Sequence, residues 1–76
     1  MEQQTPKSLL TSREKTVLRW AMEGKSAWEI GTILGITERT VKFHFTNIYR
    51  KMGVSSRSQA IVQALGKGIV NLGSIA

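Results

Sequence analysis

The stretch from Gly31 to Gly53, GTILGITERTVKFHFTNIYRKMG, decides the fold of this chain. Gly35 and Gly53 mark two helix ends, because glycine tolerates the left-handed conformation in which helices commonly stop. Thr37 follows the first of these glycines and has the side chain of a helix N-cap. The stretch therefore predicts the end of one helix, a three-residue turn and a longer basic helix, which together make a helix-turn-helix. Such a pair of helices fits the major groove of B-DNA.

Capping signals predict where the neighbouring helices begin. A hydroxyl residue with Glu or Gln three positions later occurs as Thr11 with Glu14, Ser26 with Glu29, and Ser56 with Gln59. Apolar residues at helical spacing follow each of these pairs, and glycines follow the apolar runs. The sequence thus predicts an all-α, four-helix helix-turn-helix domain with helices at about 12–23, 27–34, 38–52 and 57–67.

The ends of the chain carry weaker patterns. Residues 1–8 are polar, contain the only proline and show no apolar period, so we expect a flexible leader or linker end. The domain is expected to span 9–72, followed by a tail at 73–76. A chain of 76 residues is near the lower limit for folding without disulfides or a metal, so a single domain is the most it can form.

Composition excludes several classes of function. The chain has no Cys and no Asp and a single histidine, His44, so neither a Ser-His-Asp triad nor a metal cluster can be built. We therefore expect no catalytic residues, no metal, no cofactor and no enzymatic activity. Apolar runs are far shorter than a membrane helix needs, so a soluble cytoplasmic protein is expected. The net charge of +6 favours a polyanionic partner, although basic charge also serves solubility or contacts with ribosomes and membranes.

Placing residues 38–52 at 100° per residue separates two faces of the longest helix. A narrow apolar stripe, predicted to be buried, consists of Val41, Phe45, Ile48 and Met52. The opposite face is cationic and polar, and its candidates for reading DNA bases are Lys42, Phe43, Thr46, Asn47 and Arg39. Cations suit guanine edges, Asn47 suits adenine, and Thr46 and Phe43 suit the thymine methyl group. Phe43 is notable because an exposed phenyl ring costs burial energy unless a partner, a neighbouring turn or a second subunit covers it.

A second set of residues is suited to phosphate groups. Hydroxyls and free amides at helix N-termini attract anions, and cations or an indole N–H nearby strengthen such contacts. The phosphate candidates are Lys25, Ser26, Trp28, Thr37, Thr40, His44, Arg50 and Lys51. Three of them have an alternative role: Thr37 as a cap, Trp28 in core packing, and His44 in packing.

With these residues placed, the chain resembles the LuxR-type helix-turn-helix family of bacterial transcription regulators. The resemblance covers about residues 10–72 and rests on LTSRE at 10–14, GK at 24–25, EI at 29–30, LGIT at 34–37, TVKFH at 40–44 and KMG at 51–53. Trp20, GKSAWEI at 24–30 and RSQA at 57–60 look most like the quorum-sensing branch, whose members carry an amino-terminal acyl-homoserine-lactone sensor.

The resemblance implies that the third helix enters the major groove of double-stranded DNA and that the fourth contributes to a homodimer. Lys42, Phe43 and Thr46 match groove-side positions of the family, and Thr46 replaces a longer basic residue found in some relatives, which puts a guanine contact there in doubt. The expected dimer contacts are Ile61, Ala64 and Leu65. A small-molecule signal would act only through a sensor domain absent from these residues, so we expect either an excised domain or a small stand-alone regulator, located in the bacterial cytoplasm at the nucleoid.

Two other functions stay open at this point. The fourth helix could serve a protein-interaction module that contacts RNA polymerase or a partner subunit without base readout. A cationic peptide on a membrane surface is less favoured, because the apolar faces of four short helices suit one another better than a bilayer.

Overall fold

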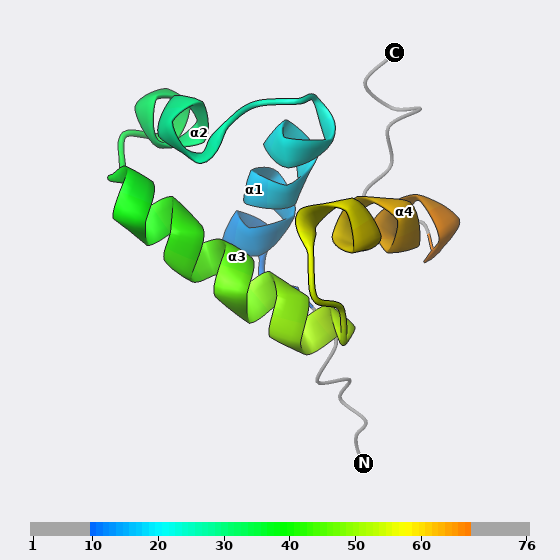
Figure 1. The fold of residues 1–76 in the computed structure, drawn as a ribbon. Helices are drawn as coiled ribbons and strands as arrows, with labels where there is room; N and C mark the ends of the chain where they lie inside the picture. The colour runs from blue at the N-terminus through cyan, green and yellow to red at the C-terminus, as the bar shows by residue number, and fades with distance from the viewer. Residues whose placement is uncertain (1–9, 68–76) are drawn as a thin grey trace.

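The computed structural model describes residues 10–67 (Figure 1). This part of the chain contains four helices and no strand: α1 (Ser12–Met22), α2 (Ala27–Leu34), α3 (Glu38–Met52) and α4 (Arg57–Lys67). The all-α prediction is confirmed, and α1 ends one residue earlier than expected, since Glu23 is its C-cap. The expected leader at 1–8 and tail at 73–76 lie outside the described residues, as do 9 and 68–72.

The helices begin where the capping signals place them. The Thr11 hydroxyl accepts the Glu14 amide at 3.1 Å, and a Glu14 carboxylate oxygen accepts the Thr11 amide at 2.9 Å. Ser26 and Glu29 repeat this reciprocal pair at 3.1 and 2.8 Å. Gly35 and Gly53 end α2 and α3 with φ of 74° and 70°, as a left-handed stop requires. Local capping contacts and left-handed glycines therefore mark where these helices begin and end.

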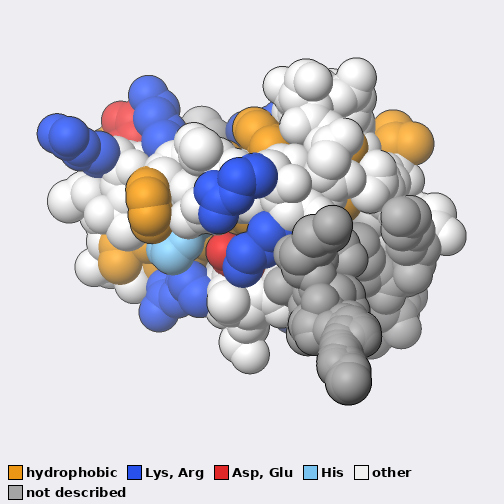
Figure 2. All heavy atoms as spheres, turned by 90° about the horizontal axis from the view of Figure 1, so that it is seen from below, with side chains coloured by type: hydrophobic (Ala, Val, Ile, Leu, Met, Phe, Trp, Pro, Cys, Tyr) orange, Lys and Arg blue, Asp and Glu red, His pale blue; other side chains and the backbone are white. Residues whose placement is uncertain are grey.

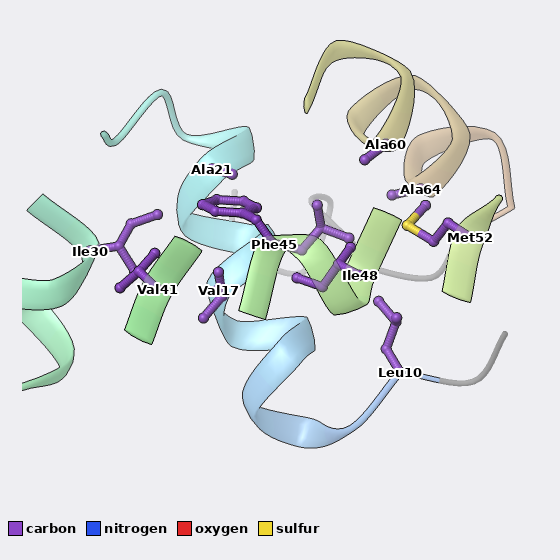
Figure 3. Packing of buried hydrophobic residues seen from close by; sticks show 11 residues of the cluster. Leu10, Val17, Ala21, Ile30, Val41, Phe45, Ile48, Met52, Ala60 and Ala64 are labelled. Atoms are coloured by element: carbon purple, nitrogen blue, oxygen red, sulfur yellow. The ribbon is translucent and has the colours of Figure 1, made fainter. Parts of the chain in front are cut away.

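Helix α3 is the centre of the fold and packs against each of the other three helices. Its stripe of Val41, Phe45, Ile48 and Met52 is buried, as the helical period predicts. Figure 3 shows this stripe meeting residues of α1, α2 and α4. The remaining buried hydrophobic residues are Leu10, Val17, Leu18, Ala21, Ile30, Ala60 and Ala64. One side of α3 is thereby committed to the core, and its other side is left outside.

Helix α4 meets this core through its two small residues, Ala60 and Ala64, both fully buried. This corrects the expectation that Ala64 belongs to a dimer interface, because a residue with no exposed surface cannot touch a second subunit. Leu65 lies one position further around the helix and is 51% exposed, while Val62 is 70% exposed. The outer apolar side of α4 is therefore formed by Val62 and Leu65, with Ile61 half-buried beside them.

Two long cationic side chains connect distant parts of the chain. Lys51, near the end of α3, donates from Nζ to Oε1 of the buried Glu14 at 2.8 Å. Arg57 donates to the Ala21 and Lys25 carbonyl oxygens and lies 5.4 Å over the Phe45 ring. The first contact corrects the expectation that Lys51 serves a phosphate group, since its ammonium group is already bound inside the protein. Arg57 in turn ties the start of α4 to the end of α1.

Candidate nucleic-acid interface

The outward face of α3 presents an exposed aromatic ring among cations. Phe43 is 62% exposed, so it folds neither over a neighbouring turn nor into the core. Its nearest aromatic neighbour is His44, a half-buried residue whose ring centroid lies 6.2 Å away. Figure 2 shows a face of the molecule on which Lys and Arg side chains lie among exposed hydrophobic side chains. The ring of Phe43 thus has no internal role that accounts for its position.

Other base-reading candidates surround this ring. Arg39, Lys42, Thr46 and Arg50 are exposed, while Asn47 is half-buried. The Asn47 side-chain carbonyl already accepts from Arg50 Nη1 at 2.9 Å. A bidentate contact with adenine uses both the oxygen and the nitrogen of an Asn amide, and the oxygen of Asn47 keeps a second lone pair for it beside the hydrogen bond from Arg50. The Thr46 hydroxyl donates to the Lys42 carbonyl at 3.2 Å, which leaves its methyl group for apolar contact.

The first turn of α3 carries the hydroxyls expected near phosphates. Thr37 caps the helix by accepting the Thr40 amide at 3.1 Å, and the two hydroxyl oxygens lie 2.9 Å apart. Glu38, which is not among the residues predicted to contact DNA, begins the helix and places a carboxylate oxygen 3.5 Å from Lys42 Nζ. The signal for this pair is its spacing of four residues on one helix. The reading face therefore contains one acid as well as cations.

The start of α2 is exposed, but the Glu29 carboxylate already binds there. Trp28 is 63% exposed, so the alternative of core packing is wrong. Ser26 donates its amide to Glu29 Oε1, and this hydrogen bond lowers the pKa of the Glu29 carboxyl below its ordinary value. A phosphate at Ser26 must therefore compete with the Glu29 carboxylate. Lys25, half-buried in the preceding turn, and the Trp28 indole are the better phosphate candidates on this side.

Ile33 of α2 is a further exposed apolar residue. It is 44% exposed, whereas Ile30 and Gly31 are buried. At 100° per residue, Ile33 lies 60° from Ile30 on the side away from Gly31, and so turns off the buried face.

Within residues 10–67, no three His, Cys, Asp or Glu side chains gather as a metal site would need, and no helix is long and apolar enough to cross a bilayer.

The short helix α2, the turn and the outward cations of α3 define the protein as a helix-turn-helix domain. Residues 8–64 match the family described as bacterial regulatory proteins, luxR family, and the chain belongs to that family. The resemblance found in the sequence is thus confirmed. The family consists of transcription regulators rather than enzymes, and the chain is a DNA-binding domain of this type.

Similar proteins extend this comparison. The chain is 54% identical over 66 residues to the transcriptional activator protein VanR of Vibrio anguillarum, covering 87% of this chain and 28% of that protein. It is 52% identical over 64 residues to the transcriptional activator protein LuxR of Aliivibrio fischeri, covering 84% and 26%. The quorum sensing-dependent transcriptional regulator RpaR of Rhodopseudomonas palustris is 51% identical over 63 residues, covering 83% and 26%. The chain therefore spans about a quarter of the length of these relatives.

A solved structure agrees with the fold. The transcription factor GerE superposes with a TM-score of 0.79 at 41% sequence identity, covering 84% of this chain and 96% of that chain. The similarity therefore includes nearly all of GerE.

Proposed function

We propose that this domain binds double-stranded DNA sequence-specifically, with α3 in the major groove, and acts in bacterial transcription regulation as a homodimer. The observation that carries the proposal is the exposure of Phe43, 62% of whose surface is free on the cationic face of α3. Covering an apolar ring with a partner removes it from water and lowers the free energy of the complex, and a thymine methyl group in the major groove is an apolar partner. The surrounding cations fit the adjacent phosphates and guanine edges.

The candidate residues of α3 and of the start of α2 are assigned two kinds of DNA contact. Base contacts are assigned to Lys42, Phe43, Thr46, Asn47 and Arg39, which lie toward the first half of α3 or along its outward side. Phosphate contacts are assigned to Lys25, Trp28, Thr37, Thr40, His44 and Arg50, with Ser26 limited by Glu29. The assignments of Lys25 and Trp28 follow the docking of helix-turn-helix domains, in which the first helix of the motif crosses the DNA backbone, and the base contacts are placed on the second helix, which lies in the major groove.

The dimer contact is assigned to α4. Val62 is 70% exposed and Leu65 51% exposed, on the side of the helix opposite the buried Ala60 and Ala64. Covering these side chains against the same residues of a second copy removes apolar surface from water. The exposed pair supports a two-fold dimer on DNA.

The relatives suggest the setting. VanR and LuxR are named transcriptional activators, and RpaR a quorum sensing-dependent regulator. We infer that this domain is the DNA-binding part of a quorum-sensing regulator, working at the nucleoid in the bacterial cytoplasm. A small-molecule signal would reach it through a sensor domain.

Selection of bound sequences from a random duplex pool, followed by gel shifts, tests the groove assignment. Lys42→Ala should weaken binding to the selected duplex by about 1–3 kcal/mol and change binding to a scrambled duplex little. Lys15→Ala, which removes an exposed cation from α1, is the matched control and should affect both duplexes alike. If Lys42→Ala leaves both affinities unchanged, α3 does not read bases through this residue.

The alternative function is a protein-interaction module that contacts RNA polymerase or a partner subunit without base readout. The exposed Val62 and Leu65 favour it, because an apolar helix face suits a protein partner as well as a second copy. Under this alternative, the selected and scrambled duplexes would bind equally well. A pool that yields no preferred sequence would support it.

A further inference from the structure

One acid on α3 has no part in the capping of its helix. Glu14 and Glu29 each accept a backbone amide in a capping box, at the starts of α1 and α2. Helix α3 is instead capped by the Thr37 hydroxyl, which accepts the Thr40 amide. Glu38 therefore makes no capping hydrogen bond, and its side chain, 46% exposed, faces Lys42.

The position of Glu38 places a negative charge where DNA is expected. It is the first residue of α3, and the first turn of a recognition helix reaches the base edges in helix-turn-helix docking. Its carboxylate is repelled by phosphates and by groove acceptors, so it lowers affinity for DNA in general. A negative charge also suits the positive end of the helix dipole, which is a stability effect that an experiment must separate from DNA readout.

We propose that Glu38 is a specificity-determining residue, acting with Lys42 to read one G·C pair. This inference rests on the proposed groove binding of α3. A carboxylate only accepts hydrogen bonds, and cytosine offers the N4 amino group as a donor in the major groove. Lys42 only donates, and guanine of the same pair offers the O6 and N7 acceptors. The two side chains therefore complement the two edges of one G·C pair.

The ion pair of the free protein fits this role. Lys42 Nζ and Glu38 Oε2 lie 3.5 Å apart, with 67% and 46% of the two side chains exposed. Exposed ion pairs of this kind contribute little stability, so each group turns to a base edge at small cost. Where guanine or thymine takes the place of the cytosine, Glu38 meets the acceptors O6, N7 or O4 instead of an amino group. Glu38 thus weakens binding to wrong sequences more than to the right one.

Three variants of the 76-residue chain test the proposal, with a selected duplex and a scrambled duplex at one salt concentration. Glu38→Gln removes the charge and keeps the shape, while Glu38→Asp keeps the charge and shortens the side chain. Glu23→Gln makes the same charge change at the exposed C-cap of α1 and serves as the control. The measured quantity is the ratio of the two affinities, because any loss of folded protein lowers both affinities equally and cancels.

We expect Glu38→Gln to raise affinity for the scrambled duplex and to lower the ratio by about fivefold or more. Glu38→Asp should lower the ratio without a gain in general affinity, and Glu23→Gln should leave it within about twofold. Changing the read G·C pair to A·T should weaken wild type more than Glu38→Gln, because Lys42 still reads guanine in the variant while the contact of Glu38 with cytosine is already altered. If Glu38→Gln and Glu23→Gln raise the affinities for the selected and the scrambled duplex by the same factor, Glu38 acts only through net charge and the inference is wrong. If wild type itself prefers no sequence, the proposed function fails first and this inference with it.

Discussion

At the scale of single residues, Phe43 and Phe45 show how two identical side chains take opposite roles. Phe43 is 62% exposed and Phe45 is 7% exposed, although they are two positions apart on one helix. The helical period alone predicts this difference, because two steps of 100° turn a side chain to the opposite face. The period does not say what covers the exposed ring, since the partner belongs to another molecule.

The two rings should respond differently to truncation. Phe43→Ala should change the free energy of unfolding by less than about 0.5 kcal/mol and weaken binding to the selected duplex. Phe45→Ala should destabilise the domain by about 3–5 kcal/mol, because it leaves a cavity beside Ile48. Urea unfolding and gel shifts on both variants measure these effects. Loss of stability in Phe43→Ala would show that the ring packs inside.

Gly31 is a residue whose constraint appears only in three dimensions. A Cβ atom there would lie 2.6 Å from the Ile36 carbonyl oxygen and 3.3 Å from the Glu38 amide nitrogen, both backbone atoms of the turn and of α3. The Ile36 amide also donates to the Gly31 carbonyl at 2.9 Å. The turn and α3 therefore approach α2 so closely that only glycine fits.

Gly31→Ala should consequently destabilise the domain by about 1–3 kcal/mol through overpacking, despite the higher helix propensity of alanine. Thr32→Ala, at the exposed neighbouring position, is the control and should stay within about 0.5 kcal/mol. Thermal or urea unfolding measures both. An unchanged or raised stability of Gly31→Ala would mean that the turn has room to move.

At the scale of elements, sequence signals predict helix bounds better than helix contacts. The bounds follow from caps and glycines that act within a few residues. The contact of Lys51 with Glu14, 37 positions apart, depends on how α1 and α3 pack. The positive charge of Lys51 does not predict which acid it binds. The same limit explains why Ala64, expected at a dimer interface, is buried while the neighbouring Leu65 is exposed. The residues of α4 that meet the core are the small Ala60 and Ala64, so the spacing of apolar residues alone does not distinguish the buried face of α4 from its exposed face.

The Lys51–Glu14 contact should stabilise the packing of α1 on α3. Lys51→Met leaves a buried carboxylate without its partner and should cost about 1–3 kcal/mol of stability. Arg50→Met changes the adjacent exposed cation and should cost less than about 0.5 kcal/mol. Urea unfolding of the two variants compares them directly. Equal effects would indicate that the ion pair contributes nothing beyond surface charge.

The same contact predicts a dependence of stability on pH. Burial acts to raise the pKa of Glu14, but the hydrogen bonds and charge of Lys51 and the hydrogen bonds of Thr11 outweigh it, so the pKa lies below its ordinary value of 4.5. A carboxyl whose pKa falls on folding stabilises the fold above its unfolded pKa, and this contribution is lost as the pH falls through the folded pKa. The stability difference between wild type and Glu14→Gln should therefore be largest near neutral pH and shrink in acid. A constant difference between about pH 6 and pH 3 would contradict this.

At the scale of the whole molecule, the small core and the exposed side of α4 favour action as a pair. A domain of this size buries little apolar surface, and Val62 and Leu65 stay outside. The fold was predictable from the sequence because its caps, periods and glycines agree with one another. Which residues of α4 stay exposed was less predictable, because burial of Ala64 and exposure of Val62 depend on how the helix packs on the core.

Leu65→Glu should separate dimer contact from DNA contact. A charge on the outer side of α4 should weaken binding to a duplex with two half-sites by about tenfold or more and leave binding to a single half-site nearly unchanged. The single half-site serves as the control within the same variant. Equal losses on both duplexes would place Leu65 in the fold or at the DNA rather than between subunits.

We propose that α3 meets the DNA through its outward face. Backbone amide chemical shifts, recorded while the selected duplex is titrated into the domain, test it most directly. We predict that the largest changes fall within residues 38–50, with smaller changes at the start of α2 and in α4. Changes centred on 57–66, with 38–50 undisturbed, would show that DNA does not bind to the outward face of α3.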